Sequence, residues 1–224
     1  MKYENIKEGI FVERPNRFIA HIEIDGDIEI CHVKNTGRCK ELLVPNSKVY
    51  VQEFDSDKRK TKYDLISVYK SDTLINIDSQ APNKVVAEFL PKLFDDIMYV
   101  KPEAKYKNSR FDFYVETKTH KIFIEVKGVT LENDEVAMFP DAPTERGVKH
   151  INELIECMED GYLAYIIFVI QMDKIKYFTP NNVTHKEFGD TLKNAKNKGV
   201  EILAFDCNIT KDSITAKDCV DIVL

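Results

Sequence analysis

The segment that most constrains the fold is the apolar run at residues 163–170, Leu-Ala-Tyr-Ile-Ile-Phe-Val-Ile. Its β-branched and aromatic residues favour a strand over a helix. Both faces of such a strand would be apolar, and this is typical of a central strand whose sheet is covered on both sides. The run therefore predicts a buried sheet at the centre of the second half of the chain.

Helical patterns lie on either side of this run. Thr144 has the position of an N-cap for a helix that continues to about residue 158 and closes at Gly161. A second helix is expected over residues 186–198, followed by a strand at 200–205. Because strands alternate with helices here, we expect an α/β layer.

The first third of the chain has a different pattern, in which polar and apolar residues alternate. Residues 18–24 and 28–33 surround the turn signal Asp25-Gly26-Asp27 and predict a hairpin. Further short strands are expected at 49–54, 65–69 and 73–77. About five short strands with polar turns indicate a small barrel of the OB-like kind.

The alternating pattern ends near residue 80, where we place a domain boundary. We expect an N-terminal β-barrel over residues 1–80 and an α/β domain with a mixed central sheet over residues 81–224. The second domain would begin with a helix around residues 83–90 that stops at Pro91. Strands are then expected at 97–101, 110–116 and 121–127.

Composition limits the classes of function. The 224 residues carry a net charge of -6, which argues against a protein that coats nucleic acid generally. Basic residues still cluster around Arg38, around Arg110 and at residues 58–62, so a local phosphate-binding groove is possible, although we read the 58–62 cluster as solvated surface. No apolar run approaches the roughly 18 residues that span a membrane, and we expect a cytoplasmic protein with no membrane contact.

One charged cluster stands out in the strand expected at 121–127. Alternate residues of a strand share a face, so Glu125 and Lys127 point the same way. Asp112 lies between two phenylalanines in the preceding strand, where a carboxylate is costly to bury without a partner. A short polar turn joins the two strands, and an antiparallel pairing would place Asp112 near Glu125 or Lys127.

This cluster has the residue types of a metal-dependent hydrolytic site. Two carboxylates can hold Mg²⁺ or Mn²⁺ and leave positions for water and a phosphate oxygen. A neighbouring lysine can stabilise the negative charge that develops. The residues alone leave a second interpretation open, a structural salt bridge of Lys127 with Asp112 or Glu125.

The chain resembles the sugar fermentation stimulation protein family over nearly its whole length. The matching segments are Arg-Pro-Asn-Arg-Phe at 14–18, Asn-Thr-Gly-Arg at 35–38, Ser-Arg-Phe-Asp-Phe at 109–113, Glu-Val-Lys at 125–127 and the proline-rich run at 139–150. The resemblance implies an OB-like barrel, a PD-(D/E)xK nuclease-like domain and non-specific DNA binding. In that pattern Asp112 is similar to the first carboxylate, and Glu125 and Lys127 are similar to the (D/E)xK pair.

The resemblance also suggests auxiliary residues. Glu88 could match a helical glutamate of such nucleases or be a solvated helix residue. Gln171 resembles a polar residue at the end of the central strand in related cores, although Met172 stands where a basic residue is expected. At the start of the helix after Thr144, Asp141 could cap the helix or pair with Arg146.

Several residues are candidates for contact with nucleic acid. Arg146 and Lys149 could bind phosphate at the helix start, and His150 on the same face could be a general base or a metal ligand. In the barrel we expect Arg17, Asn35 and Arg38 to contact DNA. Three rings could stack on bases or belong to the core: Phe11, Phe18 and His21.

The favoured hypothesis is a DNA-binding protein with a metal-dependent nuclease-like site, which could form a homodimer. The alternative is a non-enzymatic DNA-binding regulator of sugar (maltose) metabolism genes. An enzyme of sugar metabolism has no support, because the chain contains neither a G-x-x-x-x-G-K loop nor a dinucleotide fingerprint.

Overall fold

A computed structural model describes residues 1–35, 37–55 and 59–224. Its first part is a six-stranded sheet with the order β3-β2-β1-β4-β5-β6. A further parallel pairing of β3 with β5 closes the first five strands into a barrel, which confirms the predicted OB-like architecture. The strands are β1 (Ile6–Asn16), β2 (Ile19–Ile24), β3 (Asp27–Val33), β4 (Lys48–Glu53), β5 (Tyr63–Lys70) and β6 (Thr73–Asn76).

The alternation that predicted the hairpin β2–β3 also fills the barrel. Ala20, Ile22 and Ile24 point inward and are buried, while the residues between them are at least partly exposed. The prediction missed β1, which pairs with both β2 and β4. Charged residues are frequent in β1, and its two partners rather than its own apolar pattern determine that it forms a strand.

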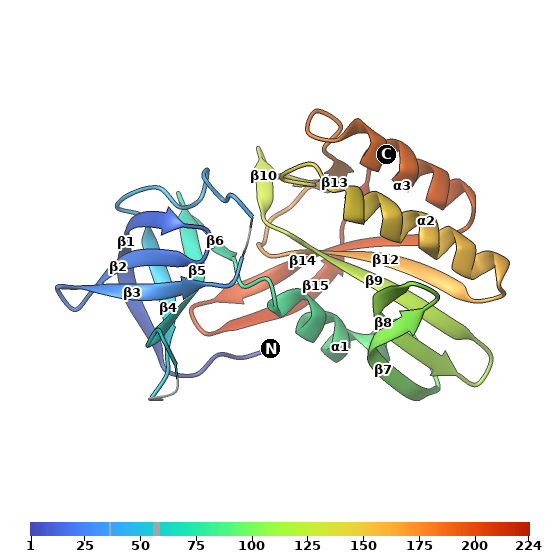
Figure 1. Cartoon of the computed structure of the whole chain (residues 1–224), viewed down its shortest axis with the longest axis horizontal. Coiled ribbons are helices and arrows are strands. Elements are labelled where there is room, and N and C mark those ends of the chain that lie inside the picture. Colours follow the sequence, from blue (N-terminus) through green and yellow to red (C-terminus); the bar gives the residue numbers. More distant parts are fainter. Residues whose placement is uncertain (36, 56–58) are drawn as a thin grey trace.

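The second part of the chain is built on another six-stranded sheet, with two helices on one side and one on the other (Figure 1). The sheet has the order β15-β14-β12-β9-β8-β7, and a separate four-stranded sheet has the order β10-β11-β13-β16. The elements are α1 (Ala81–Leu93), β7 (Ile97–Tyr106), β8 (Ser109–Thr117), β9 (Lys121–Val129), β10 (Leu131–Asn133), β11 (Val136–Phe139), α2 (Glu145–Glu159), β12 (Leu163–Ile170), β13 (Tyr177–Pro180), α3 (Lys186–Asn197), β14 (Glu201–Thr210), β15 (Ser213–Cys219) and β16 (Asp221–Ile222).

The apolar run is the central strand that the sequence predicts. β12 pairs in parallel with β9 and β14, whereas β7, β8 and β15 are antiparallel to their neighbours, so the sheet is mixed. Ile166 and Phe168 pack in the same core as α2 and α3. Ile167 and Val169 pack in the core formed with α1. A strand buried on both faces explains why the run has no polar residue.

The ends of α2 and α3 follow the expected signals. The Thr144 side chain accepts a hydrogen bond from the Gly147 N–H at 3.0 Å and caps α2. Gly161 and Gly199 follow the two helices with φ of +87° and +95°, a conformation that glycine adopts at little cost. None of the helices in the described ranges is long and apolar enough to cross a lipid bilayer.

The predicted stop of the first helix at Pro91 is wrong, because α1 continues to Leu93 with Pro91 inside it. A proline lacks the N–H donor and its ring crowds the carbonyl four residues earlier. Here the packing of α1 into the core through Val85, Val86 and Leu90 outweighs this cost. Strands β7 and β14 are also longer than predicted, and β10, β11, β13, β15 and β16 were not predicted. Three of these five, β11, β13 and β16, have at most four residues and pair with segments distant in sequence, so a local pattern carries little information about them.

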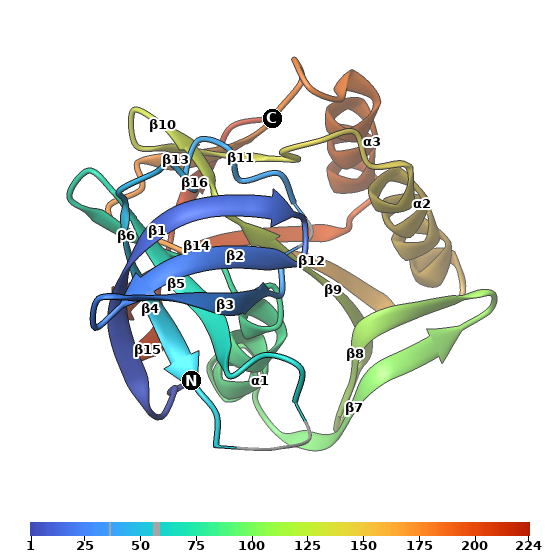
Figure 2. The ribbon, with the colours of Figure 1, turned by 60° about the vertical axis from the view of Figure 1, so that its left-hand side comes forward.

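A buried polar pair joins the barrel to the α/β domain. The two lie side by side in Figure 1, and in Figure 2 the barrel stands in front of the sheet. The Asn76 N–H donates to the Gln171 carbonyl at 2.9 Å, and the Gln171 amide donates to Asn76 Oδ1 at 2.9 Å and to the Asp78 carbonyl at 3.1 Å. Asn76 in turn donates to the Tyr3 hydroxyl at 2.9 Å. Asn76 and Gln171 are each 1% exposed, so this network orients the two domains without competition from water.

We predict that Asn76→Ala lowers the free energy of unfolding by about 3 kcal/mol, because Gln171 and Tyr3 would lose buried hydrogen bonds. Urea denaturation, monitored by circular dichroism, measures this change in the free energy of unfolding. Asn208→Ala, at an exposed position of β14, is the matched control and should change stability by less than about 0.5 kcal/mol. Equal effects of the two substitutions would contradict the prediction.

Candidate metal and nucleic-acid site

The two predicted carboxylates come together where β8 and β9 separate. The register of this pair runs from Glu116 opposite Lys121 to Phe113 opposite Ile124. The backbone pairing stops there. The next residue of β8 toward its start is Asp112, and its side chain replaces a backbone carbonyl: Oδ2 accepts a hydrogen bond from the Val126 N–H at 2.7 Å. Val126 lies between Glu125 and Lys127, so Asp112 is held beside both.

Asp112 is held mainly by neutral donors. Besides the Val126 N–H, it accepts a hydrogen bond from the Asn83 amide on α1 at 2.8 Å. Burial raises the pKa of Asp112, and the nearby Glu125 carboxylate raises it further. A positive charge placed at this point would therefore stabilise the ionised form of Asp112.

Glu125 has the opposite electrostatic environment. It is 3% exposed, and its Oε1 receives hydrogen bonds from Lys127 Nζ and His150 Nδ1, each at 2.5 Å. Burial alone would raise its pKa, but the bonds to His150 and Lys127 outweigh burial and hold the pKa below its ordinary value. Glu125 Oε2 is buried with no hydrogen-bond partner among the described residues.

Both ring nitrogens of His150 are occupied. Nδ1 lies against Glu125, and Nε2 accepts a hydrogen bond from Arg146 Nε at 3.4 Å. Because Nε2 accepts, the proton between His150 and Glu125 lies on Nδ1. In this structure His150 therefore positions Glu125, and it presents no free nitrogen as a base or a metal ligand.

A cationic cavity of about 490 Å³ lies next to His150. Arg146 and Lys149 of α2 line it, together with Arg110 of β8. Lys149 also lies 3.7 Å from Glu153, one turn along the helix, so it is partly neutralised. Two basic groups near the start of α2 and one from β8 outnumber the single carboxylate in the lining, Glu145, and such a surface favours an anion.

A second cationic cavity, of about 460 Å³, lies on the barrel. Arg17, Arg38 and Lys40 line it with apolar residues between them. Phe18 is 48% exposed and lies under the Arg17 guanidinium, with 5.4 Å between the guanidinium carbon and the ring centroid. The suggestion that Phe11 could stack on bases is wrong, because this ring is 2% exposed in the barrel core.

Arg14 determines the shape of the loop beside this cavity. Its guanidinium donates to four backbone carbonyls at 2.6 to 2.9 Å. These carbonyls belong to Arg17, Asn35, Gly37 and Arg38. One side chain thus joins the segment at residues 14–18 to the segment at 35–38.

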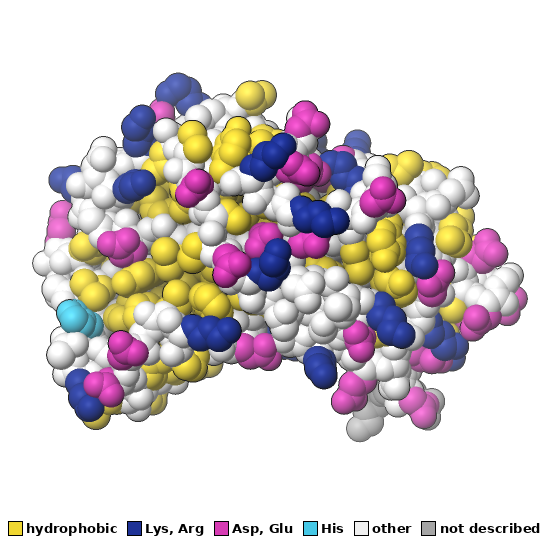
Figure 3. Space-filling model, turned by 180° about the vertical axis from the view of Figure 1, so that it is seen from behind, with side chains coloured by type: hydrophobic (Ala, Val, Ile, Leu, Met, Phe, Trp, Pro, Cys, Tyr) yellow, Lys and Arg dark blue, Asp and Glu magenta, His cyan; other side chains and the backbone are white. Residues whose placement is uncertain are grey.

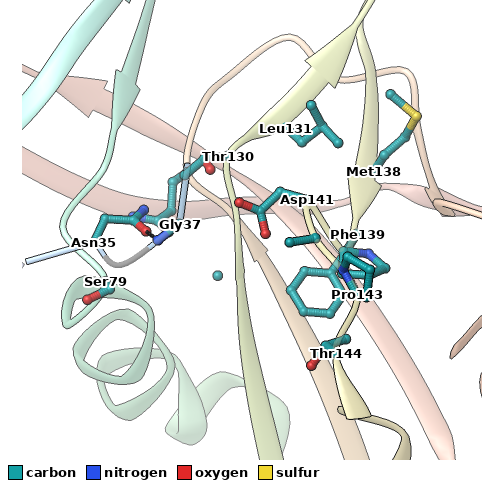
Figure 4. A pocket seen from close by; sticks show the side chains of 14 residues that line it. Asn35, Gly37, Ser79, Thr130, Leu131, Met138, Phe139, Asp141, Pro143 and Thr144 are labelled. Carbon is teal, nitrogen blue, oxygen red and sulfur yellow. Dashed lines mark hydrogen bonds between the residues drawn. The ribbon is translucent and has the colours of Figure 1, made fainter. Parts of the chain in front are cut away.

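A third cavity, of about 370 Å³, lies between the barrel and the α/β domain (Figure 4). Asn35 and Gly37 come from the barrel loop, and Asp141 and Thr144 come from the segment that leads into α2. Gly128, directly after Lys127 in β9, also lines it. This cavity therefore adjoins β9, the strand that carries Glu125.

Comparison with known protein families matches the two parts of the chain separately. Residues 12–77 match the family model described as the SfsA N-terminal OB domain, and residues 80–213 match the sugar fermentation stimulation protein RE domain. The chain belongs to the sugar fermentation stimulation protein family. The RE domain model covers the α/β domain with its mixed central sheet.

Relatives in this family match the whole chain. The sugar fermentation stimulation protein homologs of Clostridium beijerinckii and Ruminiclostridium cellulolyticum are each 64% identical over 226 residues, with full coverage of both chains. A solved structure of Pyrococcus furiosus SfsA in complex with Ca²⁺ is 29% identical, with a TM-score of 0.89, and the match covers 100% of this chain and 98% of that one.

The other residues that the family resemblance suggested lie apart from the carboxylate pair. Glu88 is exposed on α1 and bonds to the Met1 ammonium at 2.6 Å. Gln171 belongs to the interdomain network. Thr144 caps α2 in place of Asp141, and no ion pair joins Asp141 to Arg146. Lys58 and Thr36, which belong to two of the segments singled out above, lie outside the described residues.

Sequence reasoning missed two residues that support this family's site. Asn83 lies within the predicted helix, but only the packing of α1 against β8 shows that it bonds to Asp112. Arg14 lies within a matching segment, but a sequence does not reveal a side chain that bonds to four carbonyls. The one local signal for Arg14 was that it belongs to the segment at 14–18, which resembles the family.

One further group of possible metal ligands lies between α2 and α3. Suitable atoms of Glu145, His185 and Glu187 lie within 4.8 Å of one another. However, His185 Nδ1 accepts the Thr144 N–H at 3.2 Å, so the neutral ring carries its proton on Nε2. The nitrogen that faces the two carboxylates, at 3.7 Å from Glu145 and 3.9 Å from Glu187, then carries a proton and is not free to bind a metal.

We predict that His150→Ala raises the pKa of Glu125, because burial would no longer be offset by the histidine. A depressed carboxylate pKa contributes stability above the ordinary glutamate value, and this stability is lost as the pH falls through the folded-state pKa. Acid unfolding of His150→Ala should therefore begin at a higher pH than in the wild type. NMR titration of the Glu125 carboxyl carbon measures the pKa directly.

Two variants control this experiment. His150→Gln keeps an N–H donor and should restore part of the shift. His120→Ala, at an exposed position, should leave both the Glu125 pKa and the acid-unfolding midpoint unchanged. An unchanged Glu125 titration in His150→Ala would show that the histidine does not set this pKa.

Proposed function

We propose that this protein binds DNA non-specifically and hydrolyses phosphodiester bonds with a divalent cation, Mg²⁺ or Mn²⁺, held by Asp112 and Glu125. The observation that carries the proposal is a pair of fixed carboxylates, the half-buried Asp112 and the buried Glu125, with one unpartnered oxygen, Glu125 Oε2. A buried carboxylate oxygen without a donor is costly in a folded protein unless something else binds it.

The donor set fits a hard cation. Carboxylate oxygens are the ligands that Mg²⁺, Mn²⁺ and Ca²⁺ prefer, and a cation next to Asp112 would offset the repulsion that raises its pKa. The complex of the similar Pyrococcus furiosus protein with Ca²⁺ supports a site of this class. When bound, such a cation makes a coordinated water more acidic and neutralises charge on a phosphate.

The protein's own side chains supply the rest of the chemistry. Asn83 and the Val126 N–H hold Asp112, and His150 holds Glu125, so neither carboxylate must be reoriented for binding. Lys127 Nζ lies at the same carboxylate and adds positive charge where a phosphate would accumulate negative charge. Preorganised groups of this kind lower the barrier because they need little rearrangement in the transition state.

The cationic cavities supply the contacts with the DNA backbone. Arg110, Arg146 and Lys149 lie beside His150, and Arg17, Arg38 and Lys40 lie on the barrel. The face of the molecule in Figure 3 carries acidic and basic side chains interspersed, without a field of one sign. We therefore expect DNA to contact the two cavities and not to be held by the surface in general.

A non-enzymatic DNA-binding regulator of sugar metabolism genes is the second candidate. The observation that favours it is the ion pair of Lys127 with Glu125, since a lysine in this pairing also serves as a structural salt bridge. The two candidates share DNA binding and differ in cleavage.

We predict that the protein cleaves DNA when Mg²⁺ or Mn²⁺ is present, and that Asp112→Ala or Lys127→Ala lowers the rate by about 100-fold or more. Gel analysis of single-stranded and double-stranded DNA measures cleavage. Asp218→Ala and Lys211→Ala remove the same side-chain types at exposed positions and should retain the wild-type rate. Cleavage by the wild type no faster than by Asp112→Ala would refute the enzymatic part and leave the regulator.

We predict that DNA affinity falls steeply as salt rises, because phosphate contacts release counterions. Arg17→Gln and Arg146→Gln should each reduce the slope of log Kd against log salt by about one. Fluorescence anisotropy in EDTA measures binding without cleavage, and Lys211→Gln serves as the control. A flat salt dependence in the wild type would refute DNA binding by both candidates.

A further inference from the structure

Two segments that carry the resemblance line the same cavity, although about 100 residues separate them in the chain. Asn35 and Gly37 come from the segment at 35–38, and Phe139, Asp141 and Thr144 come from the proline-rich run at 139–150. Gly37 also lines the barrel cavity, but the other four belong neither to the metal pair nor to the cationic cavities. The cavity between the domains, shown in Figure 4, therefore has a role that the proposed hydrolysis does not explain.

The lining of this cavity separates into an apolar wall and a polar wall. Leu131, Met138, Phe139 and Pro143 form the apolar part. The polar part consists of Asn35, Ser79, Thr130 and Asp141. None of the described lining residues is basic, and the carboxylate of Asp141 would repel a phosphate. An occupant with a flat apolar body and an edge of hydrogen-bond donors fits this lining best.

Two polar side chains at the cavity have no partner within the described ranges. Thr130 is 9% exposed, and its hydroxyl makes no hydrogen bond with any described residue. The Asp141 carboxylate likewise receives no hydrogen bond from a described residue, and in Figure 4 it points toward Gly37 and Thr130. The Thr130 residue is largely buried and Asp141 is exposed, and both polar groups are free to bond to a ligand in the cavity.

At Gly37 the barrel loop comes very close to the side chain of Asp141. A Cβ atom added to Gly37 would lie 2.7 Å from Asp141 Oδ2 and 2.8 Å from Asn35 Oδ1. These two side chains therefore converge on the same point, and only glycine allows the barrel loop to reach Asp141. The polar wall is thus assembled from both domains.

The size and place of the cavity limit what it can hold. Its volume of about 370 Å³ is at the lower end of the roughly 300–1,000 Å³ of small-molecule sites, so it can admit one nucleoside but not a base pair within a duplex. Gly128 places the cavity one residue from Lys127 along β9. A nucleotide next to the one at the carboxylate pair can therefore reach it.

We infer that this cavity binds one unpaired nucleobase of the DNA strand, and that guanine is preferred. Guanine presents two neighbouring N–H donors on one edge, which match the two oxygens of the Asp141 carboxylate. Thr130 and Asn35 complete the polar edge, and the apolar wall covers a face of the ring. The inference rests on the proposed DNA binding. It leaves the phosphate contacts non-specific and adds a base preference at one position, beside the site.

The test is equilibrium binding of labelled oligothymidylate in EDTA, in which one central thymine is replaced by guanine, adenine, cytosine or hypoxanthine. We expect the guanine strand to bind about tenfold more tightly than oligothymidylate. Hypoxanthine lacks the 2-amino group and should lose part of this gain. Fluorescence anisotropy measures all five affinities, and no cleavage is required.

Variants connect the preference to the cavity. Asp141→Asn should abolish the guanine preference, and Thr130→Val should reduce it, while both retain binding of oligothymidylate. Asp218→Asn makes the same change of charge at an exposed position and should keep the full preference. Thermal unfolding checks that each variant is folded.

The outcomes separate this inference from the function on which it rests. If the wild type binds all five strands within about twofold of each other, the base pocket is refuted and DNA binding stands. If Asp141→Asn keeps the guanine preference, the assignment to this cavity is refuted. If no strand binds, the proposed DNA binding fails, and the inference fails with it.

Discussion

The reciprocal bonding of Asn76 and Gln171 determines how the barrel sits on the α/β domain. Both amides are buried, and each bonds to the backbone or side chain of the other at 2.9 Å. Because a buried amide loses much free energy when it is unpaired, the two domains have little freedom to rotate at this junction. The contact of Gly37 with Asp141 and the cavity between the domains both depend on that fixed orientation.

The two central carboxylates are held by opposite means, and this difference gives the site its chemistry. Neutral donors hold Asp112, and its pKa is raised by burial and by Glu125. A lysine and a histidine hold Glu125, and its pKa is lowered although it is buried. Two carboxylates with such different environments can remain close together in a folded protein and still attract a cation.

The sequence predicts the frame of this site because the relevant signals are local. The apolar run at 163–170 identifies β12, and the polar turn between β8 and β9 brings Asp112 to Glu125. The cap at Thr144 and the glycine after the helix give the bounds of α2. In each case neighbouring residues contain the information, through strand alternation, turn chemistry or capping.

The rest of the site depends on packing between distant segments. His150 was expected as a base or a ligand, and only the approach of α2 to β9 shows that it bonds to Glu125. Asn83 and Thr130 carry no local signal, since an amide in a helix or a hydroxyl after a strand is usually solvated. Pro91 shows the converse case, where a strong local signal is overridden because the packing of α1 into the core outweighs the cost of a proline in its last turn.

The four hydrogen bonds of Arg14 also limit how the barrel loop that carries Asn35, Gly37 and Arg38 can move. They share a single donor group, so the guanidinium cannot leave one carbonyl without weakening its geometry toward the others. The loop should therefore open as one cooperative unit, and its amides should exchange hydrogen with solvent at a common rate. Because this loop carries Arg38 on one side and faces Asp141 on the other, a single opening event would expose the barrel cavity and the interdomain cavity together.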